Sequence, residues 1–374
     1  MLRVCFSGGP CSGKSSAQSI VMQELSARGY KVFYVPETAT ELILSGVVPG
    51  KHITLDKFQE YVLERQISKE NFYIDVSKAY NQDKVVIIYD RGIGDQLAYI
   101  SREKLNKMLK EKYDMTLAEA FERYDCVCHL ETAAKGAVEH YQWNDPNKKD
   151  CGNNAARSES PDQAIEKDNA TLKAWVGHPH LRVFDNSTTF DEKIKRVVEE
   201  IFSVLGEPIP LEVEKKYLIK KPSQELLDKL DYVSKVDIIQ TYLESEGNIE
   251  RRVRQRGTKE EGYSYFYTEK KEVGQGIREE KEKHISLAEY VNYLAEADGN
   301  LHIVKKTRYC FIYNKKYFEL DIYPFSEEYA ILEIELENKD SKIEIPDYLE
   351  VIKEVTEDKR YKNRTLAESL KLED

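Results

Sequence analysis

The sequence LRVCFSGGPCSGKSS, residues 2–16, runs from an apolar stretch into a glycine-rich turn, and a helical pattern follows it. Gly8, four further residues, Gly13, Lys14 and Ser15 have the spacing of a phosphate-binding loop between a strand and a helix. Glycines let backbone N–H groups turn toward phosphate oxygens, and the start of a helix adds positive potential. Lys14 can reach the outer phosphates, and the Ser15 hydroxyl can hold magnesium. The residues predicted to bind the nucleotide are Gly8, Gly9, Pro10, Cys11, Ser12, Gly13, Lys14, Ser15 and Ser16.

Four more apolar runs alternate with helical stretches through the first half of the chain. They lie at residues 31–37, 84–90, 125–131 and 181–187. This alternation predicts an α/β fold, in which helices cover both faces of a parallel sheet.

Polar residues at the carboxyl ends of these runs are candidate site residues, because ligands of parallel sheets bind beyond the carboxyl ends of the strands. Glu37 ends the second run, and Asp90 and Arg91 end the third. Asp90 can hold magnesium through water or accept a proton from a substrate hydroxyl, and Arg91 can hold a phosphate. The structural alternative is that Asp90 caps the next helix and pairs with Arg91.

Residues 1–205 resemble the P-loop kinases that act on nucleosides and nicotinamide riboside. Those proteins combine the loop with an acid on the second strand and an Asp-Arg pair on the third, here Glu37 and Asp90-Arg91. The resemblance implies binding of ATP or GTP with Mg²⁺, and phosphoryl transfer in which these three residues are catalytic. It also implies that Arg157 is a catalytic arginine on a mobile lid, which the polar stretch 132–175 would form.

The nucleotide base is not settled by the sequence. Residues 147–150, NKKD, resemble the guanine-reading motif of GTPases, but they follow a loop-like stretch rather than a buried strand. Both ATP and GTP therefore remain candidate ligands.

The composition favours a cytoplasmic protein. The formal net charge of −11 argues against general nucleic-acid binding, and no apolar run approaches the roughly 20 residues of a transmembrane helix. The start, MLRVCFSGGP, is too short an apolar stretch for a secretory signal. Six cysteines in 374 residues form no disulfide framework, and we predict that Cys126 and Cys128 are reduced strand residues.

A domain boundary is predicted near residues 206–210, GEPIP, because these turn-forming residues follow a long helical pattern. We therefore expect a nucleotide-binding domain at residues 1–207 and a second domain at residues 208–374. In the second domain apolar residues alternate with polar ones, which predicts strands. The predicted strands are 212–219, 237–245, 248–257, 263–273, 276–286, 302–313, 315–325 and 329–338, and the predicted helices are 223–230, 286–298 and 346–355.

Most of these strands carry charged residues at every second position, and those of LEVEKKYLI, residues 211–219, would share one face of the strand. A half-exposed sheet with charges facing water is one explanation. The other is a barrel whose charges line an interior tunnel, where acids bind divalent cations and basic residues bind phosphates. In such a tunnel we expect Glu212 and Glu214 to lie among other acids and to repel one another.

The second explanation gains support because residues 211–365 resemble the CYTH, or triphosphate tunnel metalloenzyme, family. Its Glu-x-Glu-x-Lys signature matches Glu212, Glu214 and Lys216. The resemblance implies an eight-stranded antiparallel tunnel, dependence on Mg²⁺ or Mn²⁺, and a ligand that carries a triphosphate. The implied metal ligands are Glu212, Glu214, Asp321, Glu333 and Glu335, and the implied phosphate ligands are Lys216, Arg252, Arg254, Lys270, Arg278, Lys306 and Arg308. The extra arginines of ERRVRQRG, 250–257, leave open which two face inward.

The order of the two domains resembles the TRPL translocation defect protein type. This combination implies a GTP- or ATP-binding protein with anionic phosphate ligands such as phosphoinositides. Two functional classes therefore remain: an enzyme that turns over nucleotide and triphosphate, and a regulatory or trafficking protein that binds both with little turnover.

Overall fold

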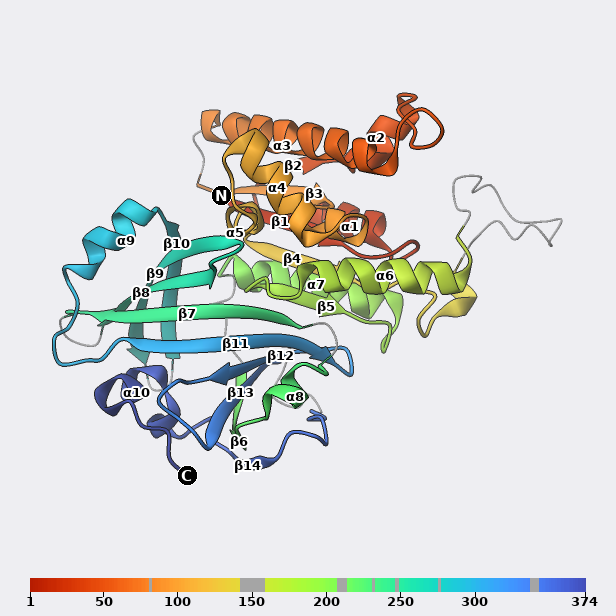
Figure 1. Ribbon diagram of the computed structural model, residues 1–374. Coiled ribbons are helices and arrows are strands. Elements are labelled where there is room, and N and C mark those ends of the chain that lie inside the picture. Colours follow the sequence, from red (N-terminus) through yellow and green to blue (C-terminus); the bar gives the residue numbers. More distant parts are fainter. Residues whose placement is uncertain are drawn as a thin grey trace. The chain divides into compact units, whose positions relative to one another are not determined.

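The computed structural model describes residues 1–80, 83–141, 159–206, 214–230, 233–245, 249–274, 277–336 and 343–374. Internal contacts divide the chain into two compact units, Met1–Pro208 and Ile209–Asp374 (Figure 1). None of the helices within these described ranges is long and apolar enough to cross a membrane.

The described residues of the first unit contain a five-stranded parallel sheet with the strand order β2-β3-β1-β4-β5. Its strands are β1 (Leu2–Ser7), β2 (Lys31–Val35), β3 (Val85–Asp90), β4 (Cys126–Leu130) and β5 (Leu181–Phe184). Its helices are α1 (Lys14–Ala27), α2 (Thr38–Leu44), α3 (Leu55–Ala79), η1 (Ile93–Ala98), α4 (Arg102–Tyr113), α5 (Leu117–Phe121), η2 (Val138–His140), α6 (Pro161–Trp175) and α7 (Phe190–Val204). The predicted α/β fold is confirmed, and β1 lies at its centre with β3 on one side and β4 on the other. The carboxyl end of β1 is therefore flanked by the ends of two other strands.

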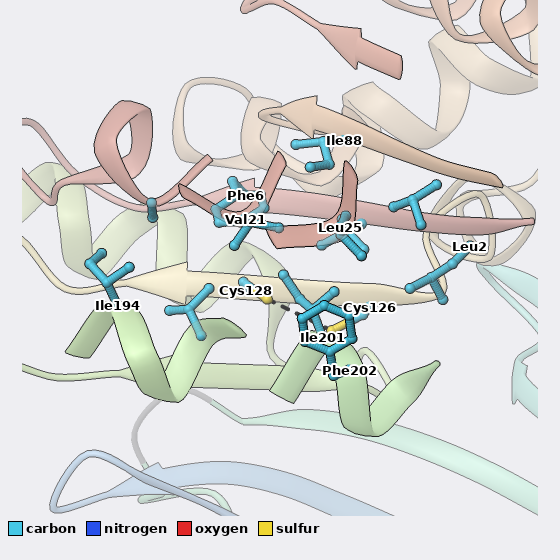
Figure 2. Packing of buried hydrophobic residues seen from close by; sticks show 14 of the residues in the cluster. Leu2, Phe6, Val21, Leu25, Ile88, Cys126, Cys128, Ile194, Ile201 and Phe202 are labelled. Carbon is cyan, nitrogen blue, oxygen red and sulfur yellow. Dashed lines mark hydrogen bonds between the residues drawn. The ribbon is translucent and has the colours of Figure 1, made fainter. Parts of the chain in front are cut away.

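A buried apolar cluster fixes α1 and α7 against one face of this sheet (Figure 2). Leu25 of α1 and Ile201 of α7 are fully buried there, beside Phe6 of β1. Cys126 and Cys128 of β4 belong to the same cluster, and their sulfur atoms share a hydrogen bond at 3.8 Å without a disulfide. The prediction of reduced strand cysteines is therefore confirmed.

The stretch 132–175 differs from the predicted lid in its last part. Residues 161–175 form α6, which begins with a capping box between Ser160 and Gln163 and has Pro161 in its first turn. The buried face of α6 carries Asp168 and Trp175. A helix anchored through buried side chains is part of the folded unit, so the lid prediction is wrong for these residues. Arg157 and residues 147–150 lie outside the described residues.

The second unit contains an antiparallel sheet, and its fold class is confirmed. The described strands follow the order β10-β9-β8-β7-β11-β12-β13-β6-β14. They are β6 (Glu214–Lys220), β7 (Ser234–Leu243), β8 (Ile249–Thr258), β9 (Gly262–Gly274), β10 (Ile277–Ile285), β11 (Val304–Tyr313), β12 (Lys316–Ile322), β13 (Tyr329–Glu335) and β14 (Val351–Glu354). The remaining elements of this unit are α8 (Gln224–Leu227), α9 (Leu287–Leu294), η3 (Lys359–Tyr361) and α10 (Asn363–Ser369).

The ninth strand, β14, replaces a helix that the sequence predicted. Residues 346–355 have helical spacing of apolar side chains, yet Val351–Glu354 pair with β6 at the edge of the sheet. Tertiary pairing overrides helical propensity here, because the edge of β6 offers hydrogen-bond partners that the isolated pattern does not reveal. Among the described residues this sheet therefore has one strand more than the eight expected.

The two faces of this sheet differ in character. One face buries Tyr217, Ile219 and Phe318 together with Leu227 of α8. The opposite face carries charged side chains along the middle of the strands. Further along that face, an apolar cluster that includes Leu218 and Tyr323 packs against residues of α10. The charged region is thus bounded on one side by a packed apolar cluster.

Candidate functional sites

The loop after β1 has the backbone of a phosphate-binding turn. Gly8 adopts a φ of 138°, and a Cβ atom there would lie 2.2 Å from the carbonyl oxygen of Leu130. Gly13 adopts a φ of 86° at the N-cap of α1. Neither position tolerates a side chain at this backbone geometry. The glycines therefore set both the path of the loop and the direction of α1, which starts at Lys14.

The Lys14 ammonium lies across this loop. Its Nζ donates to the carbonyl oxygen of Gly8 at 3.1 Å and to that of Gly9 at 3.4 Å, and it lies 3.4 Å from the Ser12 hydroxyl. Burial lowers the pKa of Lys14, and the neighbouring charge of Arg91 lowers it further. Phosphate oxygens are stronger acceptors for an ammonium than these neutral groups are, so a nucleotide can replace them.

Asp90 lies beside the loop at the end of β3, in register with Phe6 of β1. Tyr34 donates its hydroxyl to Asp90 Oδ2 at 3.3 Å. The other oxygen, Oδ1, is buried and accepts no hydrogen bond from the described residues. Burial raises the pKa of Asp90, and Glu37 raises it further, whereas Lys14 opposes both. An unpaired carboxylate oxygen near a phosphate-binding loop is suited to a metal ion or its bound water.

Glu37 and Arg91 form an ion pair at the same edge of the sheet, with 2.7 Å between Arg91 Nε and Glu37 Oε1. Burial opposes ionisation of Glu37, but Arg91 and Lys14 hold the pKa of this carboxyl below its ordinary value. Arg91 Nη1 also donates to Asp95 Oδ1 at 3.2 Å. The alternative in which Asp90 pairs with Arg91 is not what is observed, because Arg91 pairs with Glu37 and Asp95.

Asp95 is a site residue that the sequence did not single out. It is 3% exposed and accepts hydrogen bonds from the Ser7 hydroxyl at 2.6 Å and from Trp175 Nε1 at 3.1 Å. It therefore ties the end of β1 and the end of α6 to Arg91. The spacing of Asp95 four residues after Arg91 was the only signal available in the sequence.

Asp168 of α6 is a second residue that the sequence did not single out, and it anchors the loop itself. Its Oδ1 accepts from the backbone N–H of Gly9 at 2.7 Å and from that of Thr132 at 3.2 Å, and its Oδ2 accepts from Lys135 at 2.7 Å. His129 Nε2 lies 3.4 Å from Oδ1. Burial opposes ionisation, but His129 and Lys135 hold the pKa of Asp168 well below its ordinary value.

We expect Asp168→Asn to lower the free energy of unfolding of the first unit by about 1–3 kcal/mol, because Lys135 loses the closer of its two anionic partners and keeps only Glu131, at 3.7 Å. A depressed carboxyl pKa contributes stability above the unfolded value of about 3.9, and this contribution is lost as the pH falls. The deficit of the variant should therefore stay nearly constant from pH 7 to about pH 4 and shrink only as the pH falls further, toward the low folded pKa of Asp168. Urea unfolding followed by Trp175 fluorescence measures it, with exposed Glu166→Gln on the same helix as the control. A deficit that does not depend on pH would contradict this role.

In the second unit, four adjacent strands bring opposite charges onto one face. Arg308 of β11 lies opposite Asp321 of β12, and Glu333 of β13 lies opposite Lys216 of β6. Glu319 of β12 lies opposite Glu333. Because each pair is directly cross-strand, the side chains project to the same side.

Arg308 is the centre of this cluster, and its guanidinium contacts three carboxylates. Nε and Nη2 donate to the two oxygens of Asp321, both at 2.7 Å, and Nη2 also donates to Glu333 Oε2 at 2.8 Å. Nη1 donates to Glu319. Lys306 donates to Asp321 as well. Burial disfavours the Arg308 charge, but the surrounding acids raise its pKa well above the ordinary value.

Lys216 joins the cluster from the neighbouring strand. Its Nζ lies 2.8 Å from Glu333 Oε1 and 3.2 Å from Glu214 Oε1. Burial opposes both charges, yet Glu333 and Glu214 raise the pKa of Lys216, while Lys216 and Arg308 lower that of Glu333. Lys216 therefore contacts both Glu214 and Glu333, whereas the expected repulsion between Glu212 and Glu214 stays a prediction. Glu212 lies outside the described residues.

The arginines of β8 extend the basic part of this face. Arg252, Arg254 and Arg256 lie opposite Tyr242, Gln240 and Ile238 of β7 and alternate along the strand, so they share one side of the sheet. Arg254 donates to Glu282 Oε1 at 2.9 Å. Arg251 points away and donates to Tyr267 and Glu296. Three arginines of β8 therefore share this face, and Arg256 had not been predicted as a ligand.

For three further predicted tunnel ligands, the structure gives mainly the position on a strand. Lys270 lies on β9 in register with Glu250 and Glu280. Arg278 lies on β10 and Glu335 on β13, but their side chains lie outside the described part of the structure.

Two parts of the chain are similar to known proteins. Residues 3–193 match a family described as an AAA domain. The inorganic triphosphatase of Nitrosomonas europaea is 34% identical over 166 residues, a match that covers 42% of this chain and 98% of the relative. The chain belongs to the AAA-domain family in its first unit and to the family of this triphosphatase in its second.

Two solved structures are also similar to the triphosphatase-family unit. The crystal structure of the inorganic triphosphatase NE1496 shares 32% identity with a TM-score of 0.31, and covers 43% of this chain and 97% of that one. The crystal structure of the hypothetical protein NE1496 shares 33% identity with the same TM-score, and covers 42% and 99%.

The two units differ in how well their acids fit a metal ion. In the AAA-domain unit, Asp90 Oδ1 is buried and unpaired beside Lys14 and the start of α1, which fits Mg²⁺ on a bound nucleotide. In the triphosphatase-family unit, the described acids are already bonded to Arg308, Lys216 and Lys306. Within the described ranges, no three His, Cys, Asp or Glu side chains form a group that could hold a metal ion. The described residues of that unit therefore do not present a formed metal site.

Proposed function

We propose that the AAA-domain unit binds ATP or GTP with Mg²⁺ and transfers the terminal phosphoryl group to a hydroxyl of a small acceptor. The observation that carries this proposal is the meeting of Lys14, Asp90 and the Glu37–Arg91 pair at the end of β1. A protein that only holds a nucleotide needs the loop, but it has no use for a second acid and an arginine beside the loop.

The roles follow from the contacts. The loop and Lys14 hold the phosphates, and Ser15 and Asp90 would hold Mg²⁺, which neutralises charge on the transferred group. Arg91 stabilises the charge that develops on the phosphoryl oxygens. Arg157, whose structure is not described, is proposed to add a second positive charge from the lid.

Glu37 is proposed as the group that takes the proton of the acceptor hydroxyl. Arg91 and Lys14 keep Glu37 ionised, so it can accept this proton at neutral pH. The acceptor oxygen bonds to the terminal phosphorus, the bond from that phosphorus to the diphosphate breaks, and the diphosphate leaves. Acceptor and nucleotide must therefore meet between Glu37 and Lys14.

We expect Glu37→Gln to slow phosphoryl transfer by about 10²–10⁴-fold while nucleotide affinity changes little, because the amide keeps the size of the side chain but cannot take a proton. The measurement is formation of ADP from ATP, or of GDP from GTP, in the presence of Mg²⁺. The acceptors are a panel of nucleosides and nicotinamide riboside. Exposed Glu64→Gln on α3 is the control. Equal rates for wild type and Glu37→Gln would remove Glu37 from the reaction.

The same panel separates an enzyme from a regulatory protein. Kinases turn over at about 1–100 per second, whereas unassisted nucleotide switches are orders of magnitude slower. Slow formation of ADP or GDP with every acceptor would favour the regulatory or trafficking alternative.

For the triphosphatase-family unit, we propose binding and hydrolysis of a small molecule that bears a triphosphate. Support comes from the basic residues on one face, Lys216, Lys306, Arg308 and the three arginines of β8, and from the similarity to the inorganic triphosphatase. In hydrolysis, a water oxygen bonds to the terminal phosphorus, and the bond between that phosphorus and the bridging oxygen breaks. Arg and Lys donors can stabilise the charge left on the departing phosphate.

Phosphate release from inorganic tripolyphosphate and thiamine triphosphate, with Mg²⁺ or Mn²⁺, tests this second activity. Inositol phosphates should be included, because a phosphoinositide headgroup offers similar anionic oxygens. Binding of inositol phosphates without any phosphate release from the triphosphates would favour recognition over hydrolysis.

A further inference from the structure

We propose that Lys193 of α7 is a further cation of the nucleotide site: it supports the phosphate-binding loop through the carbonyl oxygen of Ser12 and strengthens nucleotide binding, although the ligand cannot reach it. The inference rests on the proposed binding of ATP or GTP by the AAA-domain unit. It adds a residue that the loop motif does not contain, because Lys193 lies 181 positions away from Ser12 in the sequence.

All three hydrogens of the Lys193 ammonium have acceptors inside the protein. Nζ donates to the carbonyl oxygen of Glu131 and to Asn186 Oδ1, both at 2.8 Å, and to the carbonyl oxygen of Ser12 at 3.4 Å. An ammonium group has three donors, and Lys193 is 2% exposed. Lys193 is therefore not available to donate to a bound nucleotide, and it can act on the ligand only through the loop and through its charge.

Asn186 extends these contacts to the chain that follows β4. Its Nδ2 donates to the carbonyl oxygens of Thr132 and Lys135, both at 2.8 Å. Lys193 thus connects three segments: the phosphate-binding loop, the end of β4 and the turn after β5. The part of the loop at Ser12 is therefore fixed to the sheet by a charged group.

The position of Lys193 is unfavourable for a lysine that has only a structural role. The helix α7 begins at Phe190, so Lys193 lies near the helix N-terminus, where a cation is disfavoured. Burial of its charge adds a second cost. The ring of Phe190 lies against Gly13, since a Cβ atom on Gly13 would be 2.5 Å from that ring. The start of α7 is therefore beside the loop, where the negative charge of a bound phosphate would offset both costs.

The charge of Lys193 is sensitive to such a ligand. Burial lowers the pKa of Lys193 to about 8, although Glu131 and Asp168 act in the opposite direction. Arg196 lowers this pKa further and Asp185 raises it. Near pH 8 about half of the molecules therefore carry the charge. The phosphates of a nucleotide favour the charged form, because charges in a buried region are only weakly screened. Nucleotide binding should therefore take up a proton.

The test is isothermal titration of the full chain with the Mg²⁺ complex of a non-hydrolysable ATP or GTP analogue. Titrations in buffers of different ionisation enthalpy give the number of protons that binding takes up. We expect at least about 0.2 protons per nucleotide at pH 8 and almost none at pH 6.5, where Lys193 is already charged. Because binding takes up protons, the affinity should fall by about two- to fivefold between pH 7 and pH 9.

Two variants assign the effect to Lys193. Lys193→Met and Lys193→Gln should bind the analogue about two- to tenfold more weakly than wild type at pH 7, and the difference should nearly disappear at pH 9. Lys14 and the ligand titrate in every one of these proteins, so the difference from wild type isolates Lys193. Lys195→Met on the same helix is the matched control, because Lys195 is exposed and pairs with Glu199.

Proton uptake that stays the same in both variants would overturn the inference. A loss of affinity that does not depend on pH would also overturn it, because Lys193 would then have only a structural role. Should neither variant fold, the wild-type titration decides, since tight binding without proton uptake at pH 8 rejects the inference alone. Absence of nucleotide binding by wild type at every pH would reject the proposed function of this unit together with the inference.

Discussion

Lys14→Ala should weaken binding of ATP and GTP by about 10- to 100-fold, because a hydrogen bond from a charged group contributes about 1.5–3 kcal/mol and each 1.4 kcal/mol is tenfold in affinity. The Lys14 ammonium contacts only two carbonyl oxygens and one hydroxyl within the loop. These neutral acceptors can be replaced by phosphate oxygens, so the lysine is available to the ligand. Titration of the full chain with a fluorescent nucleotide in the presence of Mg²⁺ measures the change.

The same substitution should not unfold the protein. Burial lowers the pKa of Lys14, so the folded state disfavours its charge, and removing that charge relieves a cost. Lys57→Ala on the surface of α3 is the matched control, because Lys57 is exposed and pairs with Glu60 of the same helix. Nucleotide affinity equal to that of wild type would remove the loop from the nucleotide site. A change in the tryptophan fluorescence spectrum of the ligand-free variant would mean that Lys14 is also needed for folding.

The architecture of the first unit could be predicted from sequence because its signals are local. Gly8 and Gly13 adopt positive φ at positions that their spacing had already marked, and the buried strands appear as continuous apolar runs. The carboxyl ends of parallel strands meet at one edge of the sheet. For that reason the sequence alone could predict that Glu37, Asp90 and Arg91 lie close together.

The anchoring residues could not be predicted, because their partners lie far away in the sequence. Asp168 contacts Gly9 across 159 positions, and Asp95 contacts Ser7 across 88. In a helix with the polar sequence PDQAIEKDNATLKAW, a buried aspartate cannot be distinguished from a solvated one. The capping box between Ser160 and Gln163, with Pro161 in the first turn, is a sequence signature of a helix start, so the helix itself was within reach of sequence reasoning.

In the second unit, the alternation of charged residues predicted which face is polar but not which charges pair. Pairing depends on strand register, and Lys216 meets Glu333 only because β6 and β13 are neighbours. Arg308 reaches acids on two different strands. The sequence therefore indicated a set of acids and a set of bases, whereas the register decides which of the described ones pair.

Arg308→Met should lower the free energy of unfolding of the second unit by about 3–5 kcal/mol at pH 7, because removal of one partner leaves buried carboxylates without compensation. Methionine keeps much of the aliphatic volume, so lost packing contributes little. Both tryptophans, Trp143 and Trp175, belong to the first unit. Unfolding of the second unit is therefore best followed by hydrogen exchange of peptides from β11 to β13, with exposed Arg360→Met as the control.

The pH dependence of this deficit provides the decisive check. Lys216 and Arg308 depress the pKa of Glu333 in the folded state, so its ion pairs stabilise wild type above the unfolded carboxyl pKa of about 4.3. This contribution is lost as the pH falls through the folded value. In Arg308→Met the unpaired acids are costly only while they are ionised, so protonation should relieve the variant. The gap between the two proteins should therefore be widest near pH 7 and should narrow toward pH 4. A gap of constant size across this range would mean that Arg308 stabilises the sheet by packing alone and not by compensating the charge of the acids around it.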